Sequence, residues 1–143
     1  MEISLLTEVT DEIVESFAQL LPQLSTSAVI PTRAELQEIA DNDSFFIARD
    51  PELGGQIVGS LTLVTFRIPT GVRSWIEDVV VDTSMRGKGI GEALTRAALQ
   101  RAAELGAKTV DLTSRPSREA ANRLYRRVGF ELRQTNLYRY DIK

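Results

Sequence analysis

Residues 79–106, VVVDTSMRGKGIGEALTRAALQRAAELG, constrain the fold most, because they place a strand, a glycine-rich turn and a long helix in direct succession. The β-branched run predicts a strand, and the alanine-rich part predicts a helix that ends at about Leu105, before a terminating glycine. The junction carries three glycines and two cations, at Arg86, Gly87, Lys88, Gly89 and Gly91. A glycine-rich turn at a helix N-terminus is typical of phosphate binding.

The rest of the sequence predicts a mixed α/β fold in a single domain, residues 1–143. Alternating and β-branched runs predict strands at 2–6, 44–50, 56–66, 72–82 and 108–114, with one or two closing strands in 130–142. Apolar periodicity predicts helices after Thr10, at 31–40, after the glycine turn and at 118–127. We therefore expect a central, mostly antiparallel sheet of six to seven strands with about four helices.

Local signals specify parts of this order. Short turns join three consecutive strands between residues 44 and 82, which predicts an antiparallel meander. The strand, helix and strand that follow predict a crossover and one parallel pair. Thr32 with Glu35 three residues later is the pattern of a capping box at the start of the helix in 31–40.

Composition excludes several kinds of chemistry. The chain has no cysteine and no histidine, so thiolate sites, a Ser-His-Asp triad and the common zinc sites are impossible, and no metal is expected. The formal charge of −3 argues against nucleic acid as a partner. The acidic N-terminus does not resemble a signal peptide, and no run approaches the roughly 18 apolar residues of a membrane helix. We expect a cytoplasmic protein with no membrane partner.

Three kinds of phosphate loop compete for the glycine-rich turn. A Walker A loop requires Gly-Lys followed by Ser or Thr, which occurs nowhere in the chain. A dinucleotide fingerprint requires G-x-G-x-x-G, and the spacing from Gly87 to Gly91 breaks it. The pattern R-x-x-G-x-G, beginning at Arg86, remains. Its backbone N–H groups would hold a pyrophosphate at the helix N-terminus, with Arg86 and Lys88 adding charge.

Two motifs together resemble those of the GCN5-related N-acetyltransferases. RGKGIG at 86–91, after EDVVVD at 77–82, resembles motif A of that family, and ANRLYRRVGF at 121–130 resembles motif B. The resemblance covers nearly all of the chain. It implies an acetyltransferase fold and acetyl-CoA as co-substrate, with the pantetheine arm along strand 77–82 near Val79 and Val81. The implied cofactor-binding residues are Val79, Val80, Val81, Arg86, Gly87, Lys88, Gly89, Ile90, Gly91, Glu92, Asn122 and Arg118.

Acetyl transfer to an amine requires a base, a donor for the developing oxyanion and an acid for the leaving thiolate. Glu77 and Asp78 are adjacent in a strand, so they face opposite sides unless a bulge intervenes, and the family characteristically has a bulge here. By resemblance Glu77 is the better candidate base, with Asp78 or a water chain as alternatives. A backbone N–H at or beside Val79 would hold the oxyanion, and Tyr125 is the candidate acid.

One departure from motif B leaves the cofactor contacts of the later helix open. The family's frequent asparagine, seven residues before the tyrosine, is Arg118 here. Its role falls either to Asn122, one turn before Tyr125, or to Arg118 as a contact to a CoA phosphate. A solvated helix position is the alternative for Arg118.

The acceptor is the least specified partner. Trp75 shares the parity of Glu77 and could form a wall of the acceptor pocket, and Arg73 could meet an anionic acceptor. The stretch RSWIEDVVV also resembles glucosamine-6-phosphate N-acetyltransferases, so a sugar-phosphate acceptor is an alternative to another small-molecule or peptide amine. A non-catalytic acyl-CoA-binding module is the second alternative. A homodimer is a further hypothesis, with contacts expected at Leu137, Tyr138 and Tyr140.

Overall fold

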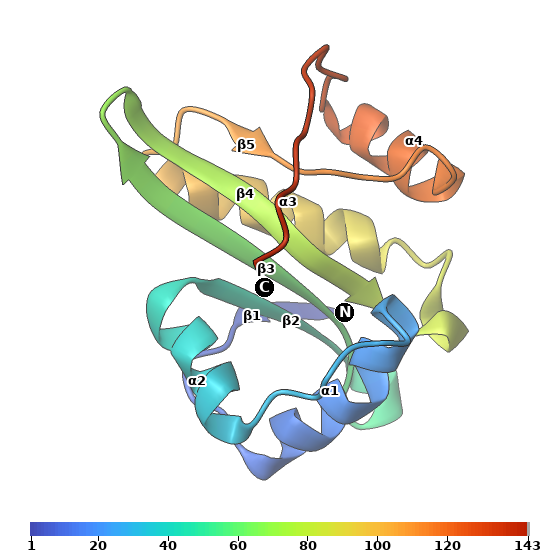
Figure 1. Ribbon diagram of the computed structural model, residues 1–143. Coiled ribbons are helices and arrows are strands. Elements are labelled where there is room, and N and C mark those ends of the chain that lie inside the picture. The colour runs from blue at the N-terminus through green and yellow to red at the C-terminus, as the bar shows by residue number, and fades with distance from the viewer. Residues whose placement is uncertain (143) are drawn as a thin grey trace. The chain divides into compact units, whose positions relative to one another are not determined.

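The computed structural model describes residues 1–142, which form two compact units, Met1–Thr113 and the segment from Ser114 onward. Figure 1 shows the first unit as a sheet with helices and the second as one helix with an extended tail.

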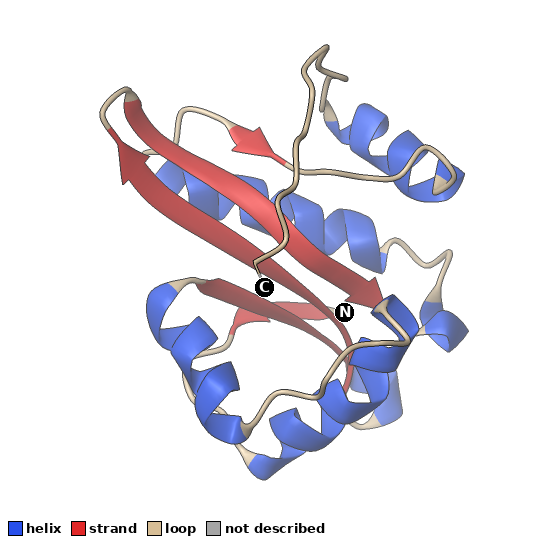
Figure 2. Ribbon diagram, in the orientation of Figure 1, coloured by secondary structure: helices blue, strands red, loops and turns tan. Residues whose placement is uncertain are grey.

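The first unit is built on a five-stranded mixed sheet in the order β1-β2-β3-β4-β5. Strands β1 to β4 pair antiparallel in succession, and β4 and β5 are parallel, which confirms the predicted meander and crossover (Figure 2). The strand bounds are β1 Glu2–Leu5, β2 Ser44–Asp50, β3 Gln56–Ile68, β4 Gly71–Val81 and β5 Val110–Asp111.

Three helices cover the two faces of this sheet. The helices α1 (Asp11–Leu24) and α2 (Arg33–Asn42) pack on one face, and α3 (Ile90–Glu104) packs on the other. Successive side chains of β2 point to opposite faces of the sheet, and Phe45 and Ile47 are the ones that join the core under α1 and α2. The apolar members of that core come mainly from α1, α2 and the sheet: Leu6, Val9, Ile13, Phe17, Leu20, Leu36, Phe45, Ile47, Ile57 and Val80.

A glycine in β3 allows α3 to approach the sheet closely. A Cβ at Gly59 would lie 3.3 Å from side-chain atoms of both Ile90 and Leu94, and 3.1 Å from the carbonyl oxygen of Val80. Both helix residues are buried. The first turn of α3, which follows the glycine-rich loop, is therefore seated directly on the centre of the sheet.

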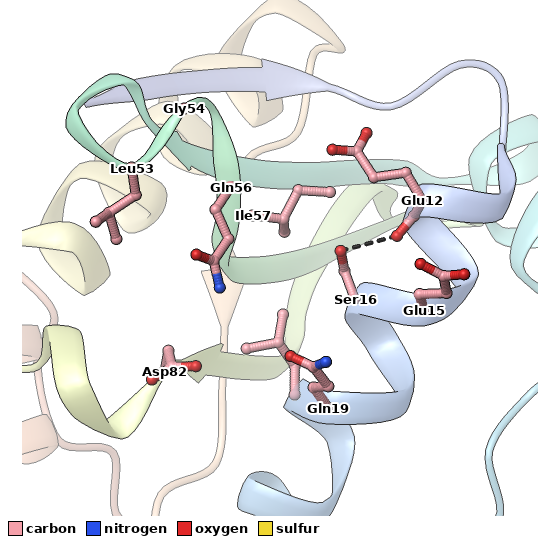
Figure 3. A pocket seen from close by; sticks show the side chains of 10 residues that line it. Glu12, Glu15, Ser16, Gln19, Leu53, Gly54, Gln56, Ile57 and Asp82 are labelled. Carbon is pink, nitrogen blue, oxygen red and sulfur yellow. Dashed lines mark hydrogen bonds between the residues drawn. The ribbon is translucent and has the colours of Figure 1, made fainter.

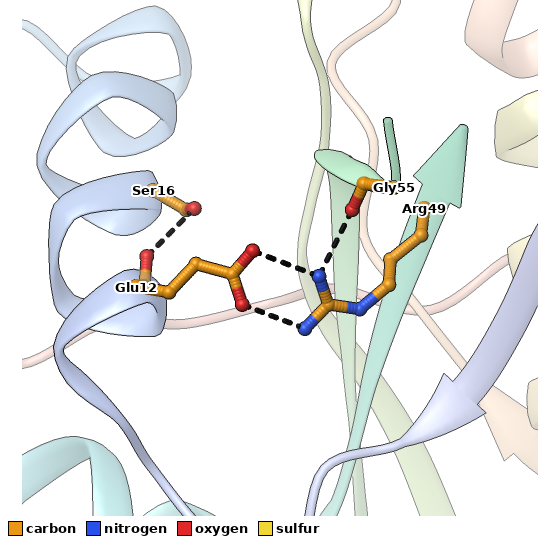
Figure 4. A network of polar contacts seen from close by, with 4 residues as sticks. All are labelled: Glu12, Ser16, Arg49 and Gly55. Atoms are coloured by element: carbon orange, nitrogen blue, oxygen red, sulfur yellow. Dashed lines mark hydrogen bonds and ion pairs between the residues drawn. The ribbon is translucent and has the colours of Figure 1, made fainter. Parts of the chain in front are cut away.

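Polar contacts stabilise the first turns of α1 and α2. The predicted capping box of α2 is confirmed: Thr32 Oγ1 accepts from the Glu35 N–H, and Glu35 Oε1 accepts from the Thr32 N–H at 2.9 Å. On α1, Glu12 accepts two hydrogen bonds of 3.0 Å from Arg49 of β2 (Figure 4), and Arg49 also donates to the Gly55 carbonyl oxygen. The bidentate pair connects the start of α1 to the β2–β3 turn.

The second unit contains α4, Glu119–Val128, which ends at Gly129 with φ 122°. The four α-helices of residues 1–142 agree with the predicted number.

The predicted six to seven strands are wrong, because residues 1–142 contain five. Strand β5 spans two residues instead of 108–114, and residues 130–142 form no strand. Alternating apolar residues give the tail a β propensity, but a strand exists only where a neighbour completes its ladder. Leu137, Tyr138 and Tyr140, the predicted dimer contacts, lie exposed in this tail.

Candidate active site

A β-bulge interrupts β4 at the predicted catalytic pair. Thr62 of β3 pairs with Glu77, whereas Ser60 pairs with Val80, so β4 carries one extra residue between these two registers. Asp78 in this interval has φ 48°, and no other non-glycine residue in 1–142 has a positive φ. An aspartate tolerates the left-handed region better than most residues, because its short polar side chain can hydrogen-bond locally. The bulge expected from the resemblance is therefore present.

The bulge changes which backbone groups of β4 face its outer edge. Before it, Ser74 N–H donates to the Thr109 carbonyl oxygen, so even-numbered residues point towards β5. After it, Asp82 N–H donates to the Val58 carbonyl oxygen of β3, so even-numbered residues point the other way. The backbone groups of Val79 and Val81 are consequently directed to the outer edge of β4.

This outer edge is left open by the short partner strand. In the described residues β4 pairs with β5 only at Ser74 with Val110 and at Trp75 with Asp111. No β5 residue pairs with positions 76–81 of β4. The part of the edge that presents Val79 and Val81 therefore has no strand partner in β5.

The side chains of Trp75 and Glu77 lie on the same face of the sheet. Trp75 pairs with Val64 and Glu77 with Thr62, and Thr62 pairs in turn with Phe45 of the core beneath α1 and α2. Trp75 is half-buried and Glu77 is exposed. The structure thus brings together a carboxylate and an aromatic side chain, as the parity argument predicts.

Arg73 occupies the next position on that face, toward the β3–β4 turn. Its Nη2 donates to Thr70 Oγ1 at 3.2 Å, and its buried Nε has no hydrogen-bond partner among the described residues. Asp111 pairs in register with Trp75, one position along, and adds a second carboxylate beside this row. An acceptor on this face would meet both signs of charge.

The glycine-rich loop follows β4 and leads into α3. Gly87 and Gly89 both have φ 80°, a conformation that favours glycine, and no atom beyond their immediate neighbours in the chain lies within 4 Å of where a Cβ on either would stand. Gly89 is the N-cap of α3 and supplies no side-chain oxygen to the first turn. The loop residues 86–89 are exposed. This is an accessible helix N-terminus, whose partial positive charge favours an anion.

Not every residue of the predicted cofactor set offers its side chain. Val80 and Ile90 are buried in the core, so only their backbones could contact a ligand. Glu92 forms an ion pair with Arg96 at 3.1 Å. Lys88 reaches back to Met85, with Nζ 3.9 Å from Sδ, while Arg86 is exposed.

The second unit carries Tyr125, Asn122 and Arg118. Burial raises the pKa of the Tyr125 hydroxyl above its ordinary value, partly opposed by the positive charge of Arg118. The Tyr125 ring makes an edge-on contact with Phe130, with centroids 5.7 Å apart. Asn122 Nδ2 donates to the carbonyl oxygens of Arg115 at 2.9 Å and Arg118 at 2.7 Å, so its amide group organises the start of α4.

Sequence reasoning missed Asp82, which follows β4 immediately. Its Oδ1 accepts from the N–H and hydroxyl of Ser84 at 3.0 and 2.7 Å, and its Oδ2 accepts from Gln23 Nε2 at 3.4 Å. These hydrogen bonds, with a smaller contribution from Arg86, lower the pKa of Asp82. The Asp-Thr-Ser sequence is an Asx-turn signal that could have identified the local part of this arrangement.

A separate pocket of about 280 Å³ lies between α1, the β2–β3 turn and Asp82 (Figure 3). Its polar lining includes Glu12, Glu15 and Gln19, and none of the predicted catalytic residues contributes to it. Glu12 is already engaged by Arg49. The pocket therefore does not include Trp75 or Glu77.

Neither a metal-ligating cluster nor a membrane-spanning helix occurs within residues 1–142. These residues contain no group of three or more His, Cys, Asp or Glu side chains that could hold a metal ion. None of the helices described is both long and apolar enough to cross a membrane.

Comparisons with known proteins show the family and the fold. Residues 7–130 match the Acetyltransferase (GNAT) family. An uncharacterized N-acetyltransferase of Methanocaldococcus jannaschii is 32% identical over 94 residues, which cover 64% of this chain and 40% of that protein. This chain thus matches less than half the length of that relative.

Two solved structures are similar over nearly the whole chain. An aminoglycoside acetyltransferase from an uncultured soil metagenomic sample, in complex with trehalose, has a TM-score of 0.84 and 25% identity, covering 99% of this chain and 96% of that one. Glucosamine-6-phosphate N-acetyltransferase from Arabidopsis thaliana has a TM-score of 0.80 and 22% identity, with 97% of each chain covered. The second likeness concerns the fold alone.

Proposed function

Because the chain belongs to the GNAT acetyltransferase family, we propose that it transfers an acetyl group from acetyl-CoA to a primary amine of a small molecule or peptide. Direct attack within a ternary complex is the proposed route. The observation that carries this proposal is the bulge at Asp78, because it directs the Val79 and Val81 backbone to an open strand edge beside the glycine-rich loop.

The residues present fit a pyrophosphate-bearing thioester. The uncapped N-terminus of α3 and the exposed loop from Arg86 to Gly89 offer backbone N–H groups and cationic charge to the phosphates. The open edge at Val79 and Val81 offers a ladder to the amide groups of the pantetheine arm. Asn122 and Arg118 are the further cofactor contacts we propose. When bound, acetyl-CoA supplies the activated acetyl group.

The proposed chemistry divides between one carboxylate, a backbone amide and a phenol. The amine nitrogen bonds to the thioester carbonyl carbon, the carbon–sulfur bond breaks, and the amine loses one proton. Glu77 accepts that proton, directly or through water, and the Val79 N–H donates to the developing oxyanion. Tyr125 protonates the departing sulfur, and its raised pKa keeps the phenol protonated at neutral pH. Asp78 is the alternative base.

The acceptor would lie against the face formed by Arg73, Trp75 and Glu77. The aminoglycoside acetyltransferase, at 25% identity, supports including polycationic aminoglycosides among the acceptors. The unpartnered Nε of Arg73 favours an acceptor with an anionic group, which keeps a sugar phosphate as the second candidate. The two classes differ in charge, so a panel of amines distinguishes them.

Thiol release from acetyl-CoA across a panel of aminoglycosides, polyamines, amino sugars, sugar phosphates and peptides tests the activity. Glu77→Gln should move or remove the acidic limb of the pH–rate profile, because the variant lacks the carboxylate of the proposed base. Tyr125→Phe should lower kcat more than it weakens acetyl-CoA binding. Unchanged kinetics in both variants would refute the assigned roles.

The same panel distinguishes the enzyme from a non-catalytic acyl-CoA-binding module. Calorimetric binding of CoA with no thiol released for any amine would favour the module. The exposed Glu77 beside a half-buried Trp75 supports the enzyme, because a binding module has no need of a base on this face.

A further inference from the structure

The side chain of Gln23 in α1 forms hydrogen bonds with the segment that leads into the glycine-rich loop. Gln23, in the last turn of α1, accepts the Thr83 N–H on Oε1 at 2.8 Å and donates from Nε2 to Asp82 Oδ2 at 3.4 Å. Its Nε2 also donates to the Gln19 carbonyl oxygen at 3.1 Å, which holds the amide against its own helix. One amide therefore contacts two successive residues that lie about 60 positions later in the chain.

The residues that Gln23 holds are themselves firmly placed. Asp82 N–H donates to the Val58 carbonyl oxygen of β3, and the Asp82 carbonyl oxygen accepts from the Met85 N–H. Asp82 Oδ1 is bound twice by Ser84, so Oδ2 is the oxygen left for Gln23. These bonds form the short turn Thr83–Met85, and the buried Met85 side chain anchors its end.

The loop beyond this turn has few restraints of its own. Residues 86–89 are exposed, and the positions of a Cβ on Gly87 and Gly89 are open to 4 Å. Glycine adopts many backbone conformations, so such a loop is ordered mainly through its two ends. Helix α3 fixes the far end on Gly59, and the Gln23-bound turn fixes the near end.

We propose that Gln23 is a positioning residue for the pyrophosphate loop. It acts through Asp82 and Thr83, and it orders the loop N–H groups before the ligand arrives, which reduces the entropy lost on binding. This inference rests on the proposed binding of acetyl-CoA. It predicts a specific selectivity, since only ligands that carry the pyrophosphate benefit from an ordered loop.

Isothermal titration calorimetry with CoA and with pantetheine, which lacks the pyrophosphate, tests the proposal. Gln23→Leu should weaken CoA binding about 3- to 10-fold, the range expected for one lost hydrogen bond to an ordered backbone, and change pantetheine binding less than about 2-fold. Gln19→Leu is the matched control, because Gln19 is exposed one turn earlier on the same helix and should leave both affinities unchanged. Gln23→Met serves if the leucine variant does not fold.

Kinetics with the best amine of the panel give a second readout. Gln23→Leu should raise the KM for acetyl-CoA about 3- to 10-fold and leave kcat within about 2-fold, because the loop does not contact the reacting atoms. Equal weakening of CoA and pantetheine, or no change in either, would overturn the inference alone. A wild-type chain that binds no CoA would refute the proposed function and this inference with it.

Discussion

Substitutions at Asp78 separate the backbone role of the bulge from the chemistry of its carboxylate. The left-handed conformation costs an L-residue about 1–2 kcal/mol, less for Asn and Asp and more for β-branched residues. Asp78 is exposed, so replacing it changes the backbone preference without altering the core. Asp78→Val should therefore lower the free energy of unfolding by about 1–2 kcal/mol. Asp78→Asn, the matched control, should change it by less than about 0.5 kcal/mol.

The same two variants report on catalysis. A bulge that relaxes would move the Val79 N–H, and a misplacement of about 1 Å can cost about 100-fold in rate. We expect kcat/KM to fall at least about 10-fold in Asp78→Val and to stay within about 3-fold in Asp78→Asn. Urea unfolding monitored by tryptophan fluorescence, with thiol release under saturating donor, measures both effects.

Two results would refute this reasoning. Equal unfolding free energies for the valine and asparagine variants would show that φ at position 78 is not constrained in the folded chain. An asparagine variant that unfolds normally yet loses as much activity as the valine variant would transfer the role of base to the Asp78 carboxylate.

Three further predictions concern stability. Gly59→Ala should lower the unfolding free energy in urea by about 1–3 kcal/mol, since the new Cβ stands 3.1 Å from a backbone oxygen, and an unchanged value would contradict the close packing of α3. Thr32→Ala should cost about 1 kcal/mol through the lost capping box, whereas Thr26→Ala in the exposed loop should cost nothing measurable. Arg49 lowers the pKa of Glu12, so this pair stabilises the fold above the unfolded pKa near 4.5 and loses its effect as pH falls through the lower folded pKa. Glu12→Gln should thus destabilise by less than about 1 kcal/mol at pH 7 and not at all in acid, and a difference that persists in acid would point to packing instead.

Local signals in the sequence predicted the elements around the site well. β2 occupies residues 44–50 as predicted, and the capping box forms because Thr32 and Glu35 need only each other. The glycine-rich loop is also determined locally, because glycine adopts positive φ angles readily. Features governed by neighbours within a few residues are readable from the chain.

Features governed by distant partners were not predictable in this way. The hydrogen bonds of Gln23 join residues about 60 positions apart in the chain, and no periodic pattern in the sequence indicates them. The tail at 130–142 shows the opposite kind of error, in which a local signal is misleading. Its alternation of apolar and polar residues predicts a strand, but residues 130–142 form none. The bulge at Asp78 came from the family resemblance, and residue alternation alone would have placed Glu77 and Val80 on opposite faces.

The short pairing between β4 and β5 has a consequence for handling the protein. An unpaired strand edge is a template onto which another chain can add, and natural proteins usually protect such edges with charges, prolines or a covering element. Residues 79–81 are three consecutive valines and so include neither a charge nor a proline. The pantetheine arm of a bound CoA, lying along this edge, would cover it for as long as the ligand stays bound. The ligand-free chain should then self-associate more readily on concentration than the chain stored with CoA.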